Sequence, residues 1–122
     1  LVAEEDLHLS ADRHRIEQVM VNFLSNAIKY SPGKDMVRVD VKRSYKDSVR
    51  VAVRDFGIGI SKDKKDLVFD RFFRVEESIK FSGLGLGLFI CKDIIERHQG
   101  SIGVECVEGE GSTFWFTIPT NL

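Results

Sequence analysis

The sequence predicts a two-layer α/β sandwich, with three helices on one face of a mixed, mostly antiparallel sheet. Two long segments, 12–30 and 84–98, carry apolar residues at helical spacing, and a shorter third helix is expected at 61–68. The expected strands form two adjacent pairs, one before and one after the second long helix. This order differs from the regular strand–helix alternation of a parallel sheet.

The first helix is expected from about Asp12 to Tyr30. Its apolar residues recur three and four positions apart, as one face of a helix requires. They are Ile16, Val19, Met20, Phe23, Leu24, Ala27 and Ile28. Ser10 or Asp12 is suited to cap the helix at its N-terminus, and the run Ser31-Pro32-Gly33 ends it.

An antiparallel hairpin is expected next. Met36–Ser44 and Val49–Asp55 each alternate valine with polar residues, and a turn at Ser44–Ser48 joins them. The strand at 49–55 then runs into a glycine-containing loop, and the short helix at Ser61–Val68 follows. The segment Arg74–Ser82 has no periodicity, so no regular element is expected there.

The second long helix is expected from Leu84 to His98, and Gln99-Gly100 ends it. One face of this helix should carry Leu84, Leu88, Cys91, Ile95 and His98. Two strands, Ser101–Val107 and Ser112–Pro119, follow and are joined by a turn at 108–111. For His98, beside the helix end, a C-capping or core role is expected.

Length and composition restrict the class of protein. A chain of 122 residues suits one domain. The net charge of −1 argues against a surface that coats nucleic acid, and no apolar run approaches the roughly 18 residues that span a bilayer. Cys91 and Cys106 lack metal-site spacing and are expected to be reduced and buried, in a reducing compartment. Because the sequence starts at Leu1 without a leader, we expect a piece of a longer protein.

A polar stripe on the first helix is the first candidate site. Asn22, Asn26 and Lys29 stand at positions i, i+4 and i+7, more than 90° from the centre of the apolar face. Amide oxygens are suitable ligands for Mg²⁺, and an ammonium group can meet phosphate oxygens. Taken alone, the stripe is better explained by an ordinary solvated helix face.

A strand-end loop is the second candidate. Asp55 is followed by Gly57 and Gly59, and glycine permits positive φ and close approach of a flat ligand to the backbone. A buried carboxylate there could accept a hydrogen bond from the exocyclic amine of adenine. A tight turn capped by Asp55 explains the same pattern equally well.

The third candidate is the glycine segment Gly83, Gly85 and Gly87, directly before a helix. Its backbone N–H groups and the helix N-terminus suit an anion. A Rossmann unit needs a buried strand before its glycines and the spacing GxGxxG. Here the polar loop 74–82 precedes the glycines and the spacing is GxGxG, so dinucleotide binding through a Rossmann unit is not expected. The chain also has no GxxxxGK[ST] motif, so no P-loop is expected.

A fourth segment, Phe69–Arg74, has paired aromatic residues flanked by Arg71 and Arg74. It could be a hinge whose guanidinium groups reach phosphate, or an ordinary amphipathic turn. Its composition fits both.

These four elements, in this order, resemble the GHKL ATPase and kinase superfamily, and most closely the ATP-binding domain of sensor histidine kinases. The resemblance runs from about Asp12 to Pro119, and it implies a Bergerat-type fold, one domain over 1–122, and binding of ATP with Mg²⁺. Asn26 would be the main Mg²⁺ ligand, helped by Asn22. The resemblance further implies phosphate contacts for Lys29, Arg71, Arg74, Gly83, Gly85, Gly87 and Leu88, and nucleoside contacts for Tyr30, Asp55, Gly57, Gly59 and Ser112. Ser112 stands where the family usually has threonine.

One position distinguishes the relatives within the superfamily. Gyrase-like ATPases have a glutamate one helical turn before the metal asparagine, as base for the attacking water, and here that place holds Asn22. An amide cannot take up a proton near neutral pH, so efficient hydrolysis is not expected. Phosphoryl transfer to a protein nucleophile supplied from outside is expected instead.

The acceptor is expected on another domain, because His8, His14 and His98 do not fit the family's acceptor pattern. The implied partners are therefore the acceptor-histidine and dimerisation domain of the parent kinase and, through the parent, a response regulator. This domain would be monomeric and cytoplasmic, in a bacterial-type parent that is a membrane-bound sensor. An anti-sigma-factor-type serine kinase and a nucleotide-sensing module without transfer activity are the alternatives.

Overall fold

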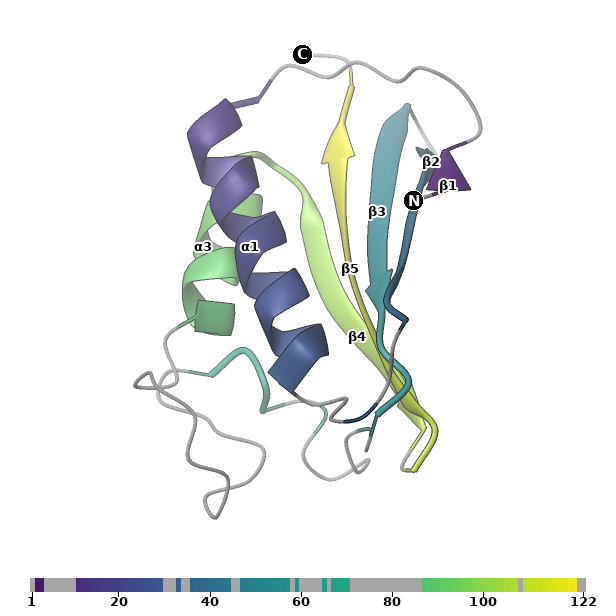
Figure 1. Cartoon of the computed structure of the whole chain (residues 1–122). Helices are drawn as coiled ribbons and strands as arrows, with labels where there is room; N and C mark the ends of the chain where they lie inside the picture. The colour runs from purple at the N-terminus through teal and green to yellow at the C-terminus, as the bar shows by residue number, and fades with distance from the viewer. Residues whose placement is uncertain are drawn as a thin grey trace.

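The computed structural model describes residues 2–3, 11–29, 33, 36–44, 47–57, 59, 65, 67–70, 87–107 and 109–120. This part of the chain forms a sheet with two helices against one face of it (Figure 1). The elements are β1 (Val2–Ala3), α1 (Arg13–Lys29), β2 (Arg38–Ser44), β3 (Ser48–Arg54), α3 (Gly87–Arg97), β4 (Ser101–Val107) and β5 (Gly111–Pro119).

The described strands lie in the order β1-β2-β3-β5-β4. β2 pairs with β3 and β4 with β5, both antiparallel, as the two expected hairpins require. The hairpins join through an antiparallel β3–β5 pair, and the short β1 pairs in parallel with β2. The predicted mixed, mostly antiparallel sheet with helices on one face is thus confirmed for the described residues.

The third predicted helix, Ser61–Val68, falls mostly outside the described residues. Lys65 is described as helical, and Leu67 and Val68, at the expected end, lie in a turn. The presence of a third helix therefore stays a prediction.

The core fills the space between the helices and the inner face of the sheet. Phe23 of α1 is fully buried, with its ring 5.6 Å from that of Phe114 and 6.0 Å from that of Phe116. The buried residues of this hydrophobic core are Val19, Phe23 and Ala27 of α1, Cys91, Ile94 and Ile95 of α3, Val49, Val51 and Val53 of β3, Val104 of β4, Phe114, Phe116 and Ile118 of β5, and Val68. The alternating residues of β3 and β5 therefore face the helices, as the sequence pattern predicts.

One expectation about helix faces needs correction, and a second is incomplete. Ile28 is 69% exposed, although it was expected on the apolar face of the first helix. Five residues along a helix turn the side chain by about 140°, which carries Ile28 to the far side from Phe23. On α3, Ile94 joins Cys91 and Ile95 in the core, while Leu88 is partly buried.

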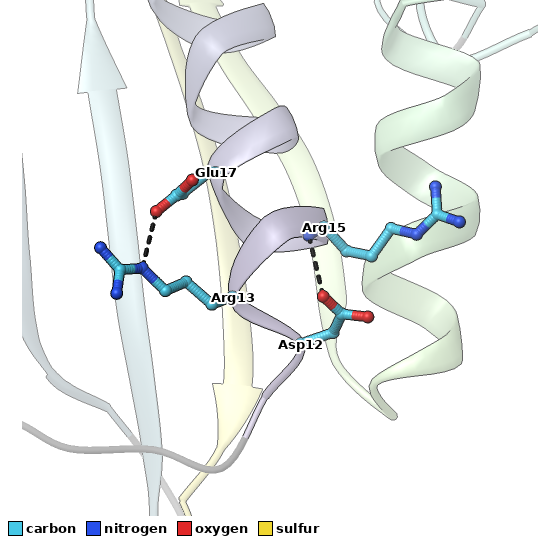
Figure 2. A network of polar contacts seen from close by, with 4 residues as sticks. All are labelled: Asp12, Arg13, Arg15 and Glu17. Carbon is cyan, nitrogen blue, oxygen red and sulfur yellow. Dashed lines mark hydrogen bonds and ion pairs between the residues drawn. The ribbon is translucent and has the colours of Figure 1, made fainter.

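The start of α1 is capped by Asp12 (Figure 2). The Asp12 Oδ1 accepts a hydrogen bond of 3.2 Å from the Arg15 N–H, and the Asp12 carbonyl accepts one of 3.0 Å from Ile16. Arg13 and Glu17, both exposed, form an ion pair of 2.9 Å one turn further on. Asp12 is thus the N-cap among the two expected candidates, and Ser10 lies outside the described residues.

His98 joins the end of α3 to the start of α1. Its Nε2 accepts the Asp12 N–H at 3.0 Å, and its Nδ1 lies 2.8 Å from the carbonyl oxygen of Ile94. Since a backbone N–H can only donate, Nε2 is the acceptor of the first bond, and Nδ1 is the ring atom left to donate to the Ile94 carbonyl. The expected C-capping role is confirmed, and the same side chain also satisfies the N-cap residue of another helix. In many helices the side chain of the third helical residue accepts the N–H of the N-cap residue. Here that residue is Arg15, whose side chain has no acceptor atom, so His98 accepts the Asp12 N–H instead.

The two cysteines are free thiols in different surroundings. Cys91 is fully buried, and burial raises the pKa of its thiol to about 12. Cys106 is only partly buried, so the expectation that both are buried holds for Cys91 alone. Within the part of the chain that the structure covers, no helix is long and apolar enough to cross a bilayer.

Only one thiol is expected to react quickly in the folded protein. At pH 8, Cys91 should hold a thiolate fraction about a thousandfold smaller than a thiol at the reference pKa of 9.0, and it is also shielded from the reagent. Titration with a maleimide should therefore label Cys106 rapidly and Cys91 only after addition of guanidinium chloride. Rapid labelling of a Cys106→Ser variant in the native state would contradict this.

Candidate functional site

The first and third candidate elements meet between α1 and α3. Asn22, half-buried on α1, lies against Gly87, the first residue of α3. A Cβ atom on Gly87 would stand 2.6 Å from the Asn22 Oδ1, so only a glycine fits there without movement of the amide. The polar stripe of α1 and the last glycine of the predicted segment are therefore neighbours in space.

Asn26 lies one turn beyond Asn22 and is also half-buried. Lys29 is the last residue of α1. The first turn of α3, beside this stripe, contains no acidic residue. Its N-terminal N–H groups and positive dipole end are thus not neutralised by a neighbouring carboxylate on the same turn, which suits an anion.

The second candidate element is built around a buried carboxylate. Asp55, just after β3, is 2% exposed. Its Oδ1 accepts hydrogen bonds from the Gly57 N–H at 3.1 Å and from the Ser112 N–H at 3.2 Å. Its own N–H donates to the Ser112 carbonyl at 2.9 Å. Asp55 therefore caps a tight turn, which the sequence pattern predicted as the alternative to adenine binding. The same carboxylate also bonds that turn to the start of β5.

Glycines allow this close approach. Gly59 has a positive φ of 71°, as expected for a glycine of this loop. Gly111 has φ of 105°, and a Cβ atom there would overlap the Asp55 carbonyl oxygen and lie 3.0 Å from the Phe56 Cα. Gly111 was not among the predicted site residues. The sequence Gly109-Glu110-Gly111-Ser112 could have indicated Gly111, but only Ser112 of this turn was predicted to belong to the site.

Several predicted site residues lie outside the described part. They are Tyr30, Arg71, Arg74, Gly83 and Gly85, together with the side chain of Lys29. Leu88 is described in the first turn of α3, where it packs against the core. The roles of these residues stay predictions.

A hollow of about 240 Å³ opens elsewhere, along α3. It is lined by Phe69, Asp70, Phe89, Lys92, Asp93 and Glu96. Three carboxylates and one ammonium make this hollow unsuited to a polyphosphate, and of the four candidate segments it includes only Phe69 and Asp70. It is therefore not the site that the motifs indicate.

The chemistry of the donor groups limits what metal could bind. Across the described residues, no cluster of three or more histidine, cysteine or carboxylate side chains could hold a metal ion. A metal at the α1 stripe would therefore rely on amide oxygens and on oxygens of a ligand. That donor set suits Mg²⁺, which commonly keeps waters and binds through few protein groups plus substrate phosphates.

Comparison with known proteins gives one consistent result. The profile of the family described as histidine kinase-, DNA gyrase B-, and HSP90-like ATPase matches residues 11–122. The chain is 41% identical over 120 residues to the sensor histidine kinase WalK of Bacillus subtilis, covering 95% of this chain and 20% of WalK. It therefore spans about a fifth of the length of that relative.

Solved structures agree. The nucleotide-free catalytic domain of histidine kinase ThkA superposes with a TM-score of 0.82 at 37% identity, covering 97% of this chain and 75% of that one. Full-length ShkA in complex with AMPPNP gives a TM-score of 0.83 at 29% identity, covering 97% of this chain and 24% of that one. ThkA has also been solved in complex with the response regulator protein TrrA.

Proposed function

Because this chain belongs to the histidine kinase-, DNA gyrase B-, and HSP90-like ATPase family, we propose that it is the ATP-binding domain of a sensor histidine kinase. It binds ATP with Mg²⁺ and donates the γ-phosphoryl group to a histidine on a separate dimerisation and acceptor domain. The observation that carries the proposal is the joint presence of the buried Asp55 turn and the Asn22–Gly87 contact in a chain 41% identical to a histidine kinase.

Asp55 selects the base in this proposal. Its Oδ1 is occupied by two backbone N–H groups, which fixes the plane of the carboxylate. The carboxylate then accepts the exocyclic amine of adenine, and Gly57, Gly59 and Ser112 let the base approach the backbone. Tyr30 would line the same pocket. A buried acceptor of fixed orientation favours adenine over a base that presents a carbonyl at that position.

The phosphates extend toward the N-terminus of α3. Asn26 supplies its amide oxygen to Mg²⁺, and the ion, when bound, neutralises charge on the phosphate oxygens. Backbone N–H groups of Gly83, Gly85, Gly87 and Leu88 meet the phosphate oxygens, and Lys29, Arg71 and Arg74 add positive charge. These groups orient the γ-phosphorus for in-line attack by the acceptor imidazole.

Transfer is favoured over hydrolysis because the chain offers no base for water at the usual position. The amide of Asn22 cannot accept a proton, so an attacking water would not be activated there. The relatives WalK and ThkA are histidine kinases by name, which also favours the histidine kinase over the serine-kinase and nucleotide-sensing alternatives. A single domain over 1–122, monomeric by itself, fits this role in a bacterial-type sensor whose ATP-binding part is cytoplasmic. The response regulator is then a partner of the parent.

The test is a transfer assay with γ-labelled ATP. With the acceptor domain of the parent kinase added, we expect acid-labile label on the acceptor, and without it neither self-labelling nor rapid hydrolysis. Asn26→Ala should reduce transfer on the order of 100-fold, since it removes the main Mg²⁺ ligand. Ser25→Ala, next to Asn26 on the same helix but not among the predicted ligands, is the matched control and should retain transfer.

Other outcomes separate the alternatives. Acid-stable label on serine of an added partner would support the anti-sigma-factor-type kinase. Binding of ATP without transfer to any acceptor would support the nucleotide-sensing module. Full transfer by the Asn26→Ala variant would remove the proposed metal role of that residue.

A further inference from the structure

The contact between Asn22 and Gly87 has a consequence for the role of Asn22, which the sequence suggested as a second Mg²⁺ ligand. The Asn22 Nδ2 donates a hydrogen bond of 3.0 Å to the carbonyl oxygen of Gln18, one turn earlier on α1. A carbonyl oxygen can only accept, so the nitrogen of the amide must point to Gln18. The Oδ1 is therefore the atom that faces Gly87.

The space on that side of the Oδ1 is already taken by α3. A single carbon atom added to Gly87 would stand 2.6 Å from the Oδ1, well inside van der Waals contact. A Mg²⁺ ion with its retained waters needs far more room than one carbon. The Oδ1 also faces the positive end of the α3 dipole, which attracts an amide oxygen and disfavours a cation.

Both ends of α3 contact α1. At one end the Oδ1 of Asn22 sets how closely Gly87 approaches α1, and at the other the Nε2 of His98 accepts the Asp12 N–H at 3.0 Å. α3 therefore runs antiparallel to α1 between two fixed points. Its first residue is also the last glycine of the predicted phosphate-binding segment.

We infer that Asn22 is a positioning residue, which sets the place of the α3 N-terminus and with it the backbone groups that receive the phosphates, rather than a second ligand of Mg²⁺. The inference rests on the proposed function for the identity of the ligand, and on the Gln18 and Gly87 contacts for the role. Asn26 is then the asparagine of the stripe that binds the metal.

The test is a double-mutant cycle between positions 22 and 87. Gly87→Ala forces its new methyl group against the Oδ1, so the amide must rotate away from Gln18. In an Asn22→Ala background the same methyl group enters space that the amide has left. The change in helix propensity from glycine to alanine is equal in both backgrounds and cancels.

The first readout is nucleotide affinity, measured by calorimetric titration with ATP in Mg²⁺ and again in excess EDTA. Gly87→Ala alone should weaken binding about tenfold in both buffers, and less than about threefold in the Asn22→Ala background. Asn26→Ala is the comparator and should weaken binding in Mg²⁺ only. If Gly87→Ala were equally harmful in both backgrounds, or if Asn22→Ala behaved like Asn26→Ala, the positioning role would be wrong.

Asn22→Asp separates the two roles further. It keeps an oxygen of the same size facing Gly87, provides a stronger metal ligand, and removes the donor to Gln18. A positioning residue predicts weaker ATP binding in Mg²⁺ and in EDTA alike, whereas a metal ligand predicts retained or stronger binding in Mg²⁺.

The second readout needs no nucleotide, which separates this inference from the proposed function. The wild type, the two single variants and the double variant are unfolded in urea. The change in unfolding midpoint of the double variant should differ from the sum of the changes in the two single variants. A wild-type chain that failed to bind ATP would overturn the function, yet this coupling would still report on the contact. A wild-type chain that bound ATP but showed no coupling in either readout would overturn the inference alone.

Discussion

Replacing Asp55 with asparagine is expected to weaken ATP binding by about 100-fold or more while the fold persists. A hydrogen bond to a charged group contributes about 1.5–3 kcal/mol, and its loss here is compounded by an unfavourable pairing. The asparagine Oδ1 must keep accepting from the Gly57 and Ser112 N–H groups. Its Nδ2 is then turned toward the adenine amine, and two donors face each other.

This reasoning also predicts a change of base preference. Inosine triphosphate presents a carbonyl oxygen where ATP presents the amine, so it accepts a hydrogen bond at that position. The Asp55→Asn variant should therefore bind inosine triphosphate at least as tightly as ATP, whereas the wild type should prefer ATP. Calorimetric titration of both nucleotides against both proteins measures the four affinities.

The matched control is Asp40→Asn. Asp40 lies on β2, where its carboxylate pairs with Arg38 at 3.1 Å. The substitution therefore makes the same chemical change as Asp55→Asn, but away from the predicted pocket. Its variant should bind ATP as the wild type does. If Asp55→Asn also retained near-normal ATP affinity with an intact fold, adenine recognition by Asp55 would be wrong.

The sequence predicts the local elements well because their periodicity is a property of neighbouring residues. α1 and the two hairpins follow from spacing of 3.6 and 2 residues, and the cap at Asp12 follows from residue type. Ile28 was misplaced because spacing alone does not fix how far the buried face of a helix extends. Its exposure depends on which elements pack around α1, and no local pattern contains that information.

The contacts that build the site are the part that sequence patterns could not give. Ser112 is 57 residues from Asp55, and His98 is 86 residues from Asp12. Such pairs are brought together by the β3–β5 pairing and by the packing of α3 on α1. The motifs named Asp55 and Ser112 separately, and only the fold explains why the same carboxylate serves both a turn and a neighbouring strand.

Gly111 is the position where a single methyl group should damage this arrangement most. Its φ of 105° is rarely adopted by residues with a side chain, and a Cβ atom would overlap the Asp55 carbonyl oxygen. The overlapped atom is backbone, which cannot rotate away as a side chain can. Gly111→Ala must therefore separate β5 from the Asp55 turn.

We expect Gly111→Ala to lower the free energy of unfolding by about 3 kcal/mol or more, through backbone strain and the displaced strand together. Urea denaturation measures this loss. The folded fraction should also bind ATP weakly, because separation breaks the Ser112 N–H to Asp55 Oδ1 bond and the Asp55 N–H to Ser112 carbonyl bond. Titration at low temperature, where the variant stays folded, measures the affinity.

Gly109→Ala is the control that isolates the overlap from the strain. Gly109 lies in the same turn with φ of 85°, but a Cβ atom there meets nothing within 4 Å. It should lose only the strain of a positive φ, about 1 kcal/mol, and keep its ATP affinity. Equal losses at the two glycines would mean that the turn conformation matters and the contact with Asp55 does not. A larger loss of stability at Gly111, with ATP affinity reduced at that position alone, would show that the backbone of β5 is what holds the adenine-binding carboxylate in place.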